Sequence, residues 1–253
     1  MTIKTATLNG VATIEIARPE KKNAITGAMY VQLAEALTAA TADDTVRAVL
    51  LTGQPGIFTS GNDIDDFVKR PASLEEAPSF AFMKALMGCD KPVIAAVTGA
   101  AIGIGTTMLL HCDFVFVSDE ARLAMPFVSL GLVPEFASSL IVPQLMGNVR
   151  AAEKLLLGDP FTGADAVECG IANAVLPASE VVKHARRVAE RFNALPPGAV
   201  RETKRLLRRA RSAAVLETIG VEGQTFGARL QSPEAKEAFS AFFEKRKPDF
   251  SRF

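Results

Sequence analysis

The sequence predicts an α/β fold followed by a helical C-terminal region. Up to about Pro177, short β-branched apolar runs alternate with helical patterns, which favours parallel strands with helices on both faces. From Ser179 onward only helical patterns remain. The 253 residues are 49% hydrophobic and 22% charged, a composition typical of a globular enzyme and not of a disordered or fibrous chain.

The first expected element is a hairpin, because segments 5–8 and 11–16 flank Asn9-Gly10, a dipeptide that favours a type I′ turn. Thr26 is a candidate N-cap for a helix that ends near Asp43-Asp44. The other expected core elements are strands at 46–52, 92–97 and 114–118, with helices at 80–88, 104–111 and 137–145. Further helices are expected at 180–192, 198–211, 213–230 and 233–245.

The charge balance argues against a polyanion as the main partner. Lys+Arg 28 equals Asp+Glu 28, so no global field attracts nucleic acid. Cys89, Cys112 and Cys169 fit neither a disulfide framework nor a zinc site. The start of the sequence resembles no signal or transit peptide, and Ser251-Arg252-Phe253 differs from the peroxisomal Ser-Lys-Leu, so a cytoplasmic location is expected.

The uncharged run from Val93 to Cys112 is long enough to cross a bilayer. Because glycines and threonines interrupt it, we expect a buried strand, a turn and a buried helix there, and no membrane as a partner. Gly103 and Gly105 resemble part of a dinucleotide-binding fingerprint, but Met108 occupies the third glycine position. No nicotinamide cofactor is therefore expected.

Two glycine-containing turns follow predicted strands, at Ser60-Gly61-Asn62-Asp63 and at 98–103. At the ends of adjacent parallel strands, such turns can aim two backbone N–H groups at one carbonyl oxygen, which is an oxyanion hole. Spacing alone leaves open the alternative that both are ordinary connecting loops.

Glu135 is the one charged residue between 123 and 147. A carboxylate among apolar neighbours is either an N-cap, here for the helix at 137–145, or an acid/base group with a raised pKa, and the residues alone leave both open. The consecutive His111, Cys112 and Asp113 point in different directions and are expected to be structural, so no metal site is predicted.

The segment from Arg201 to Arg211 is rich in cations with apolar residues between them. The cations are Arg201, Lys204, Arg205, Arg208, Arg209 and Arg211. A solvated helix face is the expected explanation, and contact with a phosphorylated ligand or with nucleic acid is the alternative.

An ordered set of motifs resembles the crotonase, or enoyl-CoA hydratase/isomerase, superfamily over essentially the full chain. The set comprises Asn23-Ala24-Ile25, Phe58 to Ile64, Lys91 to Ala95, Gly99 to Gly103 and Cys112-Asp113. This resemblance implies a spiral of ββα turns at 1–195 and a helical trimerisation or lid region at 196–253. It also implies an acyl-CoA thioester substrate, no separate cofactor, and a homotrimer or dimer of trimers.

By this resemblance, the N–H groups of Asn62 and Ile104 are the oxyanion donors. The residues implied to contact the substrate are Ala24, Ser60, Gly61, Asp63, Ile64, Gly103, Phe127 and Leu132. Hydratases of this family carry two glutamates that position water, and Thr107 and Phe127 stand in those places, so water addition is disfavoured.

The segment around Pro134-Glu135 is similar to the Δ3,Δ2-enoyl-CoA isomerase branch, in which this glutamate is the base. The implied activity moves a double bond from the 3- to the 2-position of an enoyl-CoA. Alternatives are a hydratase-like or other acyl-CoA enzyme of the same fold, and a non-catalytic acyl-CoA- or RNA-binding protein.

Overall fold

The structure is a computed structural model that describes residues 2–67 and 77–253. Its strands are β1 (Ile3–Leu8), β2 (Val11–Ile16), β3 (Ala48–Thr52), β4 (Ile57–Thr59), β5 (Val93–Val97), β6 (Ala100–Ile102), β7 (Phe114–Ser118), β8 (Arg122–Ala124), β9 (Phe161–Thr162) and β10 (Ala174–Leu176). Its α-helices are α1 (Gly27–Ala42), α2 (Ile64–Phe67), α3 (Pro78–Gly88), α4 (Ile104–Thr107), α5 (Ser138–Met146), α6 (Asn148–Ala152), α7 (Gly163–Glu168), α8 (Ala178–Glu190), α9 (Pro197–Arg209), α10 (Ser212–Leu230) and α11 (Pro233–Phe243). Short helical turns lie at η1 (Pro19–Lys21), η2 (Met108–His111), η3 (Val128–Leu130), η4 (Glu153–Leu157) and η5 (Arg191–Ala194).

The larger sheet has the order β1-β2-β3-β5-β7-β10. The predicted hairpin is confirmed, because β1 and β2 pair antiparallel and both Asn9 and Gly10 have positive φ. The pairs from β2 to β10 are all parallel, as the alternation of strand and helix predicts. Thr26 caps α1 as expected, since its side chain accepts a hydrogen bond from the Met29 N–H.

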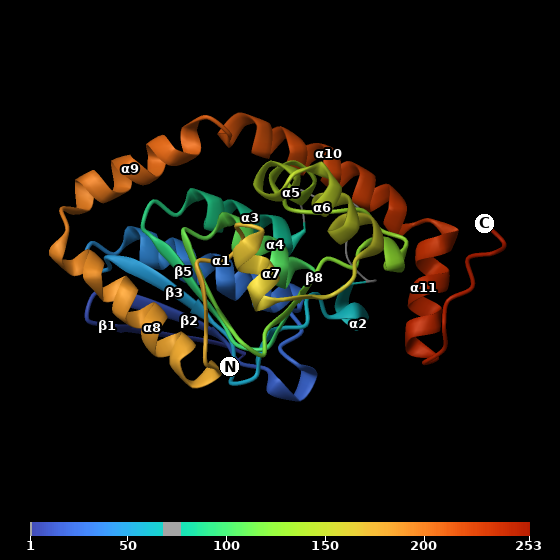
Figure 1. Cartoon of the computed structure of the whole chain (residues 1–253), viewed down its shortest axis with the longest axis horizontal. Coiled ribbons are helices and arrows are strands. Elements are labelled where there is room, and N and C mark those ends of the chain that lie inside the picture. The colour runs from blue at the N-terminus through green and yellow to red at the C-terminus, as the bar shows by residue number, and fades with distance from the viewer. Residues whose placement is uncertain (1, 68–76) are drawn as a thin grey trace.

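Helices cover both faces of this sheet (Figure 1). In β3, Val49 and Leu51 belong to the main core, which includes residues of α1 and α3. Ala48 and Leu50 face the other way and pack in a second cluster with residues of α8. Burial on both faces explains why the strands are continuous apolar runs with no polar alternation.

A second sheet, of order β4-β6-β8-β9, is absent from the sequence prediction. Its strands have two or three residues each, too few for a hydrophobic period, and β6 lies inside the segment expected to be a turn at 98–103. The parallel pairing of Thr59 with Ala101 sets the ends of β4 and β6 side by side. The two glycine turns that follow these strands are therefore neighbours.

The expected helix at 104–111 forms as α4 followed by the 3₁₀ turn η2. The uncharged run 93–112 is thus divided among β5, β6, α4 and η2. Within residues 2–67 and 77–253, no helix is both long and apolar enough to span a membrane.

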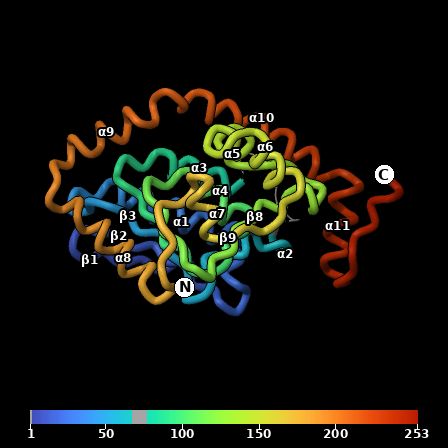
Figure 2. Tube along the Cα trace, in the orientation of Figure 1, coloured from blue at the N-terminus to red at the C-terminus, as the bar shows by residue number. Residues whose placement is uncertain are grey.

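From Pro197 to Phe243 the chain forms three helices: α9 and α10 form an arch over the rest of the chain, with α11 at its end (Figures 1 and 2). The expectation of a solvated cationic face on α9 is wrong for Lys204 and Arg208. Lys204 Nζ lies 2.6 Å from the Asp113 carboxylate, and Arg208 donates to the same carboxylate at 3.1 Å. These two cations point inward because Asp113 and nearby backbone carbonyls accept their hydrogen bonds. The apolar Leu206 and Leu207 of the same helix are instead 58% and 77% exposed.

Candidate active site

The first glycine turn follows β4 and is held by hydrogen bonds on both sides of Asn62. The Gly61 N–H donates to Thr59 Oγ1 at 3.1 Å, and the Asp63 N–H donates to the Ile25 carbonyl at 2.9 Å. The Asn62 N–H donates to no group among residues 2–67 and 77–253. Gly61 has φ +92°, and a Cβ there would lie 2.8 Å from the Ile102 carbonyl oxygen, so this close approach requires glycine.

The second turn connects β6 to α4. Gly103 has φ +58°, and its N–H donates to the Ala124 carbonyl at 2.9 Å. Ile104 is the first residue of α4, so its N–H is one of the groups that a helix start leaves without an intrahelical acceptor. Two N–H groups from adjacent turns are thus available near each other, which is what an oxyanion hole requires.

Both turns border a small, largely apolar cavity of about 80 Å³. It is lined by Ser60, Gly61, Asn62, Ile64, Ile102, Gly103, Pro126, Phe127, Leu130, Leu132, Phe226 and Phe239. Seven of the sequence-predicted site residues are in this set. Phe226 of α10 and Phe239 of α11 were not predicted, because no local pattern indicates which face of a late helix folds back over the core.

Ala24 and Asp63 do not line the cavity. Instead, both accept hydrogen bonds from Arg18 next to the first glycine turn. Arg18 Nη1 donates to the Asp63 carboxylate at 2.6 Å and to the Ala24 carbonyl at 2.9 Å. Burial alone raises the pKa of Asp63, but hydrogen bonds from Arg18 and from the Asp66 N–H hold that pKa below its ordinary value. Asp63 therefore stays ionised and is a poor proton acceptor.

Glu135 lies in the segment that joins η3 to α5, three residues after the cavity-lining Leu132. It is partly buried and is not itself among the lining residues. Its backbone carbonyl accepts hydrogen bonds from the N–H and the hydroxyl of Ser138, at 3.2 and 2.7 Å.

A different carboxylate occupies the N-terminus of α5. Glu222 of α10 accepts hydrogen bonds from the Ala137 N–H at 2.6 Å and from the Ser139 N–H at 2.9 Å. The capping function considered for Glu135 is therefore performed by Glu222. Sequence reasoning missed Glu222, because 85 residues separate it from Ala137.

Thr107 and Phe127, the residues at the places where the resemblance implies hydratase glutamates, are both buried. Thr107 is inaccessible in α4, and its Oγ1 has no hydrogen-bonding partner among the described residues. Phe127 contributes its ring to the cavity. Neither side chain can ionise, so neither can serve as a general base toward water.

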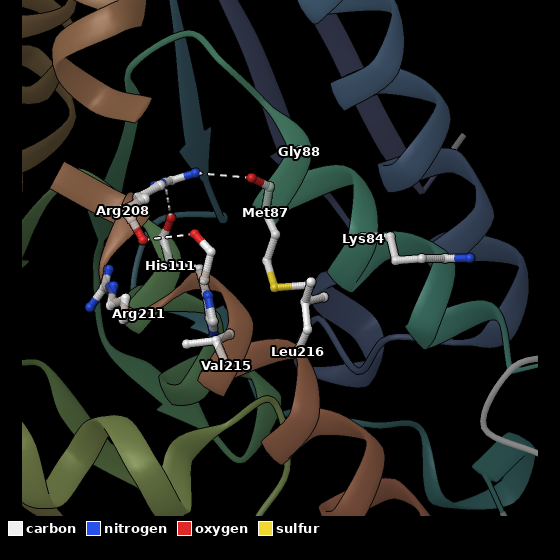
Figure 3. Close-up of a pocket in the computed structure, with 9 residues that line it drawn as sticks. Lys84, Met87, Gly88, His111, Arg208, Arg211, Val215 and Leu216 are labelled. Atoms are coloured by element: carbon white, nitrogen blue, oxygen red, sulfur yellow. Dashed lines mark hydrogen bonds between the residues drawn. The ribbon is translucent and has the colours of Figure 1, made fainter. Parts of the chain in front are cut away.

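A larger cavity, of about 330 Å³, lies between α3, η2 and the junction of α9 with α10 (Figure 3). Met87, His111, Arg208, Arg211 and Val215 are among its lining residues. It contains neither glycine turn, so we place the candidate chemistry in the smaller cavity. Among residues 2–67 and 77–253, no cluster of three or more His, Cys, Asp or Glu side chains is arranged to hold a metal ion.

Comparison with known proteins gives one consistent result. The sequence profile described as "Enoyl-CoA hydratase/isomerase" matches residues 6–252. The chain is 36% identical over 243 residues to enoyl-CoA delta isomerase 2 of Rattus norvegicus, a match that covers 94% of this chain and 62% of that protein. The chain thus spans less than two thirds of that relative.

Hydratases and solved structures are similar as well. The chain is 28% identical over 242 residues to 2,3-dehydroadipyl-CoA hydratase of Escherichia coli K12, covering 95% of this chain and 94% of that protein. The structure of Pseudomonas aeruginosa OdaA is similar with a TM-score of 0.93 at 52% identity, covering 95% of this chain and 98% of that one.

Proposed function

The chain belongs to the enoyl-CoA hydratase/isomerase, or crotonase, family, and from that premise we propose that it is a Δ3,Δ2-enoyl-CoA isomerase. The family and the α/β crotonase-like fold with a helical C-terminal region, both predicted from the sequence, are confirmed. The finer proposal is carried by two side chains that cannot ionise, Thr107 and Phe127, at the places where the resemblance implies the hydratase glutamates, together with Glu135 three residues after the cavity-lining Leu132.

In the proposed reaction, the thioester oxygen accepts hydrogen bonds from the Asn62 and Ile104 N–H groups. Glu135 removes a proton from C2, the C2–H electron pair enters a dienolate, and the negative charge develops on the thioester oxygen between the two donors. The same carboxyl then returns its proton to C4, and the double bond comes to rest between C2 and C3. One acid/base group suffices, and no separate cofactor takes part.

The other carboxylates near the site support Glu135 as the base. Arg18 keeps Asp63 ionised, and Glu222 is engaged with the N-terminus of α5. The apolar lining of Phe127, Leu132 and Phe226 lowers the polarity of the cavity wall, and hydrogen bonds to a developing oxyanion are stronger in such surroundings.

Because hydratases are also relatives, hydration is the second candidate activity. It requires a group that positions and deprotonates water, and the two glutamate positions lack one. Isomerisation is therefore the favoured activity, ahead of hydration.

A homotrimer or dimer of trimers in the cytoplasm is part of the same proposal. Leu206 and Leu207 of α9 and Val221 of α10, exposed at 58%, 77% and 60%, are apolar side chains on the arch that a second copy can cover. Light scattering on the purified protein measures the oligomer directly.

The decisive test of the function is Glu135→Gln, assayed with 3-hexenoyl-CoA by the absorbance of the conjugated product. The change keeps the shape but removes the proton acceptor, so kcat should fall by about 10²-fold or more. Binding of an unreactive acyl-CoA should persist. Glu180→Gln, the same change at a half-buried carboxylate of α8 that pairs with Lys183, is the matched control. Normal turnover in Glu135→Gln would contradict the assignment.

A further inference from the structure

The two residues that follow Glu135 have an unusual backbone. Phe136 and Ala137 have φ values of +59° and +56°, in the left-handed region that residues with a Cβ disfavour. Two consecutive residues of this kind persist only where surrounding groups hold them. The direction in which the Glu135 side chain leaves the backbone depends on this segment.

His111 holds the carbonyl side of the peptide between these two residues. Its Nε2–H donates to the Phe136 carbonyl at 2.8 Å, and its ring stacks on the Phe136 ring with centroids 3.8 Å apart and planes 14° apart. His111 is buried, and burial, with smaller effects from Arg208 and Arg211, lowers its pKa to about 3. The imidazole is therefore neutral, and its proton lies on the nitrogen that faces the carbonyl.

Glu222 holds the N–H side of the same peptide. Its carboxylate accepts the Ala137 N–H at 2.6 Å and the Ser139 N–H at 2.9 Å. The peptide plane is thus fixed at both polar ends by two side chains from elements far apart in the sequence, η2 and α10. Neither His111 nor Glu222 lines the small cavity.

We propose that His111 and Glu222 are positioning residues that clamp the Phe136–Ala137 peptide and so aim the Glu135 carboxylate at the substrate. This inference rests on the proposed role of Glu135 as the base. Without the clamp, φ at Phe136 and Ala137 can relax to negative values, and the carboxylate loses its alignment. Substrate binding by the two glycine turns does not depend on the clamp. A loss confined to kcat is therefore its signature.

The test removes the Nε2–H donor of His111 and keeps an aromatic ring in its place. His111→Phe should lower kcat for 3-hexenoyl-CoA by about 10-fold and leave KM within about twofold, since one hydrogen bond is lost outside the binding surface. His111→Gln, whose amide can donate to the same carbonyl, should recover most of kcat. His184→Phe is the matched control, because His184, the other histidine of the chain, packs against Phe116 in the cluster near α8.

A double variant distinguishes failure of the clamp from failure of the proposed function on which it rests. If His111 acts through Glu135, the variant Glu135→Gln with His111→Phe should be no slower than Glu135→Gln alone. A further loss in the double variant, or a normal kcat in His111→Phe beside an impaired Glu135→Gln, overturns the clamp and leaves the base in place. Normal turnover in Glu135→Gln overturns the proposed function itself.

Glu222→Gln gives a second, independent measurement if His111→Phe does not fold. The amide retains one oxygen acceptor where the carboxylate supplies two, so kcat should fall with KM unchanged. Combining Glu222→Gln with Glu135→Gln should again lower kcat no further than Glu135→Gln alone. If Glu222→Gln instead raises KM and leaves kcat unchanged, Glu222 does not position the base.

Discussion

Tyr30 Oη donates a hydrogen bond of 2.8 Å to Oδ1 of Asn62. The side chain of Asn62 is thereby tied to α1, while its backbone N–H belongs to the turn beside the cavity. The two parts of one residue have separable functions, and substitutions can address each in turn.

Asn62→Ala removes the side chain and retains the N–H. Because Tyr30 is fully buried, loss of this hydrogen bond should lower the free energy of unfolding by about 1 to 2 kcal/mol. The kcat for isomerisation should stay within about threefold. Urea unfolding and steady-state assays of the same preparation measure both quantities.

Gly61→Ala acts on the donor itself. The glycine has φ +92°, and an added Cβ would meet the Ile102 carbonyl oxygen at 2.8 Å, so the turn must move. Loss of one well-aimed oxyanion donor costs roughly 2.7 to 4 kcal/mol of transition-state stabilisation, which predicts a kcat lower by about 10² to 10³. If Asn62→Ala proves as damaging in a folded protein, the side chain is the active group and the backbone-donor account is wrong.

Sequence reasoning correctly predicted the elements that a few neighbouring residues specify. Asn9-Gly10 specified the hairpin, Thr26 marked the start of α1, and the family motifs placed both glycine turns. It missed the short strands of the second sheet, whose formation depends on pairing with distant segments. It also misjudged the cations of α9, because whether Lys204 points inward depends on where Asp113 lies after folding.

The clamp on the Glu135 segment was not predictable from local pattern either. His111 follows an apolar run, and Glu222 sits in a long helix without any special neighbour. Both side chains bind the same peptide, between Phe136 and Ala137, and only folding brings them to it.

Thr107→Val tests whether the hydroxyl of Thr107, at a place where the resemblance implies a glutamate in hydratases, contributes to activity or stability. Since Thr107 Oγ1 is buried without a hydrogen-bonding partner in the described residues, the isosteric change should raise the free energy of unfolding by about 1 kcal/mol. Isomerisation should change by less than about twofold, and hydration of crotonyl-CoA should remain far slower than isomerisation in both proteins. A hydration rate equal to the isomerisation rate would show that another residue positions water.

The pH dependence of stability tests the neutral state of His111. Its folded pKa of about 3 lies below the ordinary value of 6.5, so between these pH values the unfolded chain binds a proton that the native protein does not. The stabilisation is complete above pH 6.5 and is lost as the pH falls toward 3, with a slope of up to about 1.4 kcal/mol per pH unit.

His111→Gln has no titrating group at this position, and the other ionisable groups are common to both proteins. The free energy of unfolding of the unsubstituted protein, minus that of His111→Gln, should therefore decrease by about 2 kcal/mol between pH 7 and pH 5. Urea unfolding at each pH, at fixed ionic strength and protein concentration, measures this difference. Parallel curves for the two proteins would mean that native His111 takes up a proton as readily as the unfolded chain does. Such a result would contradict an imidazole kept neutral by burial, with the cations of Arg208 and Arg211 nearby.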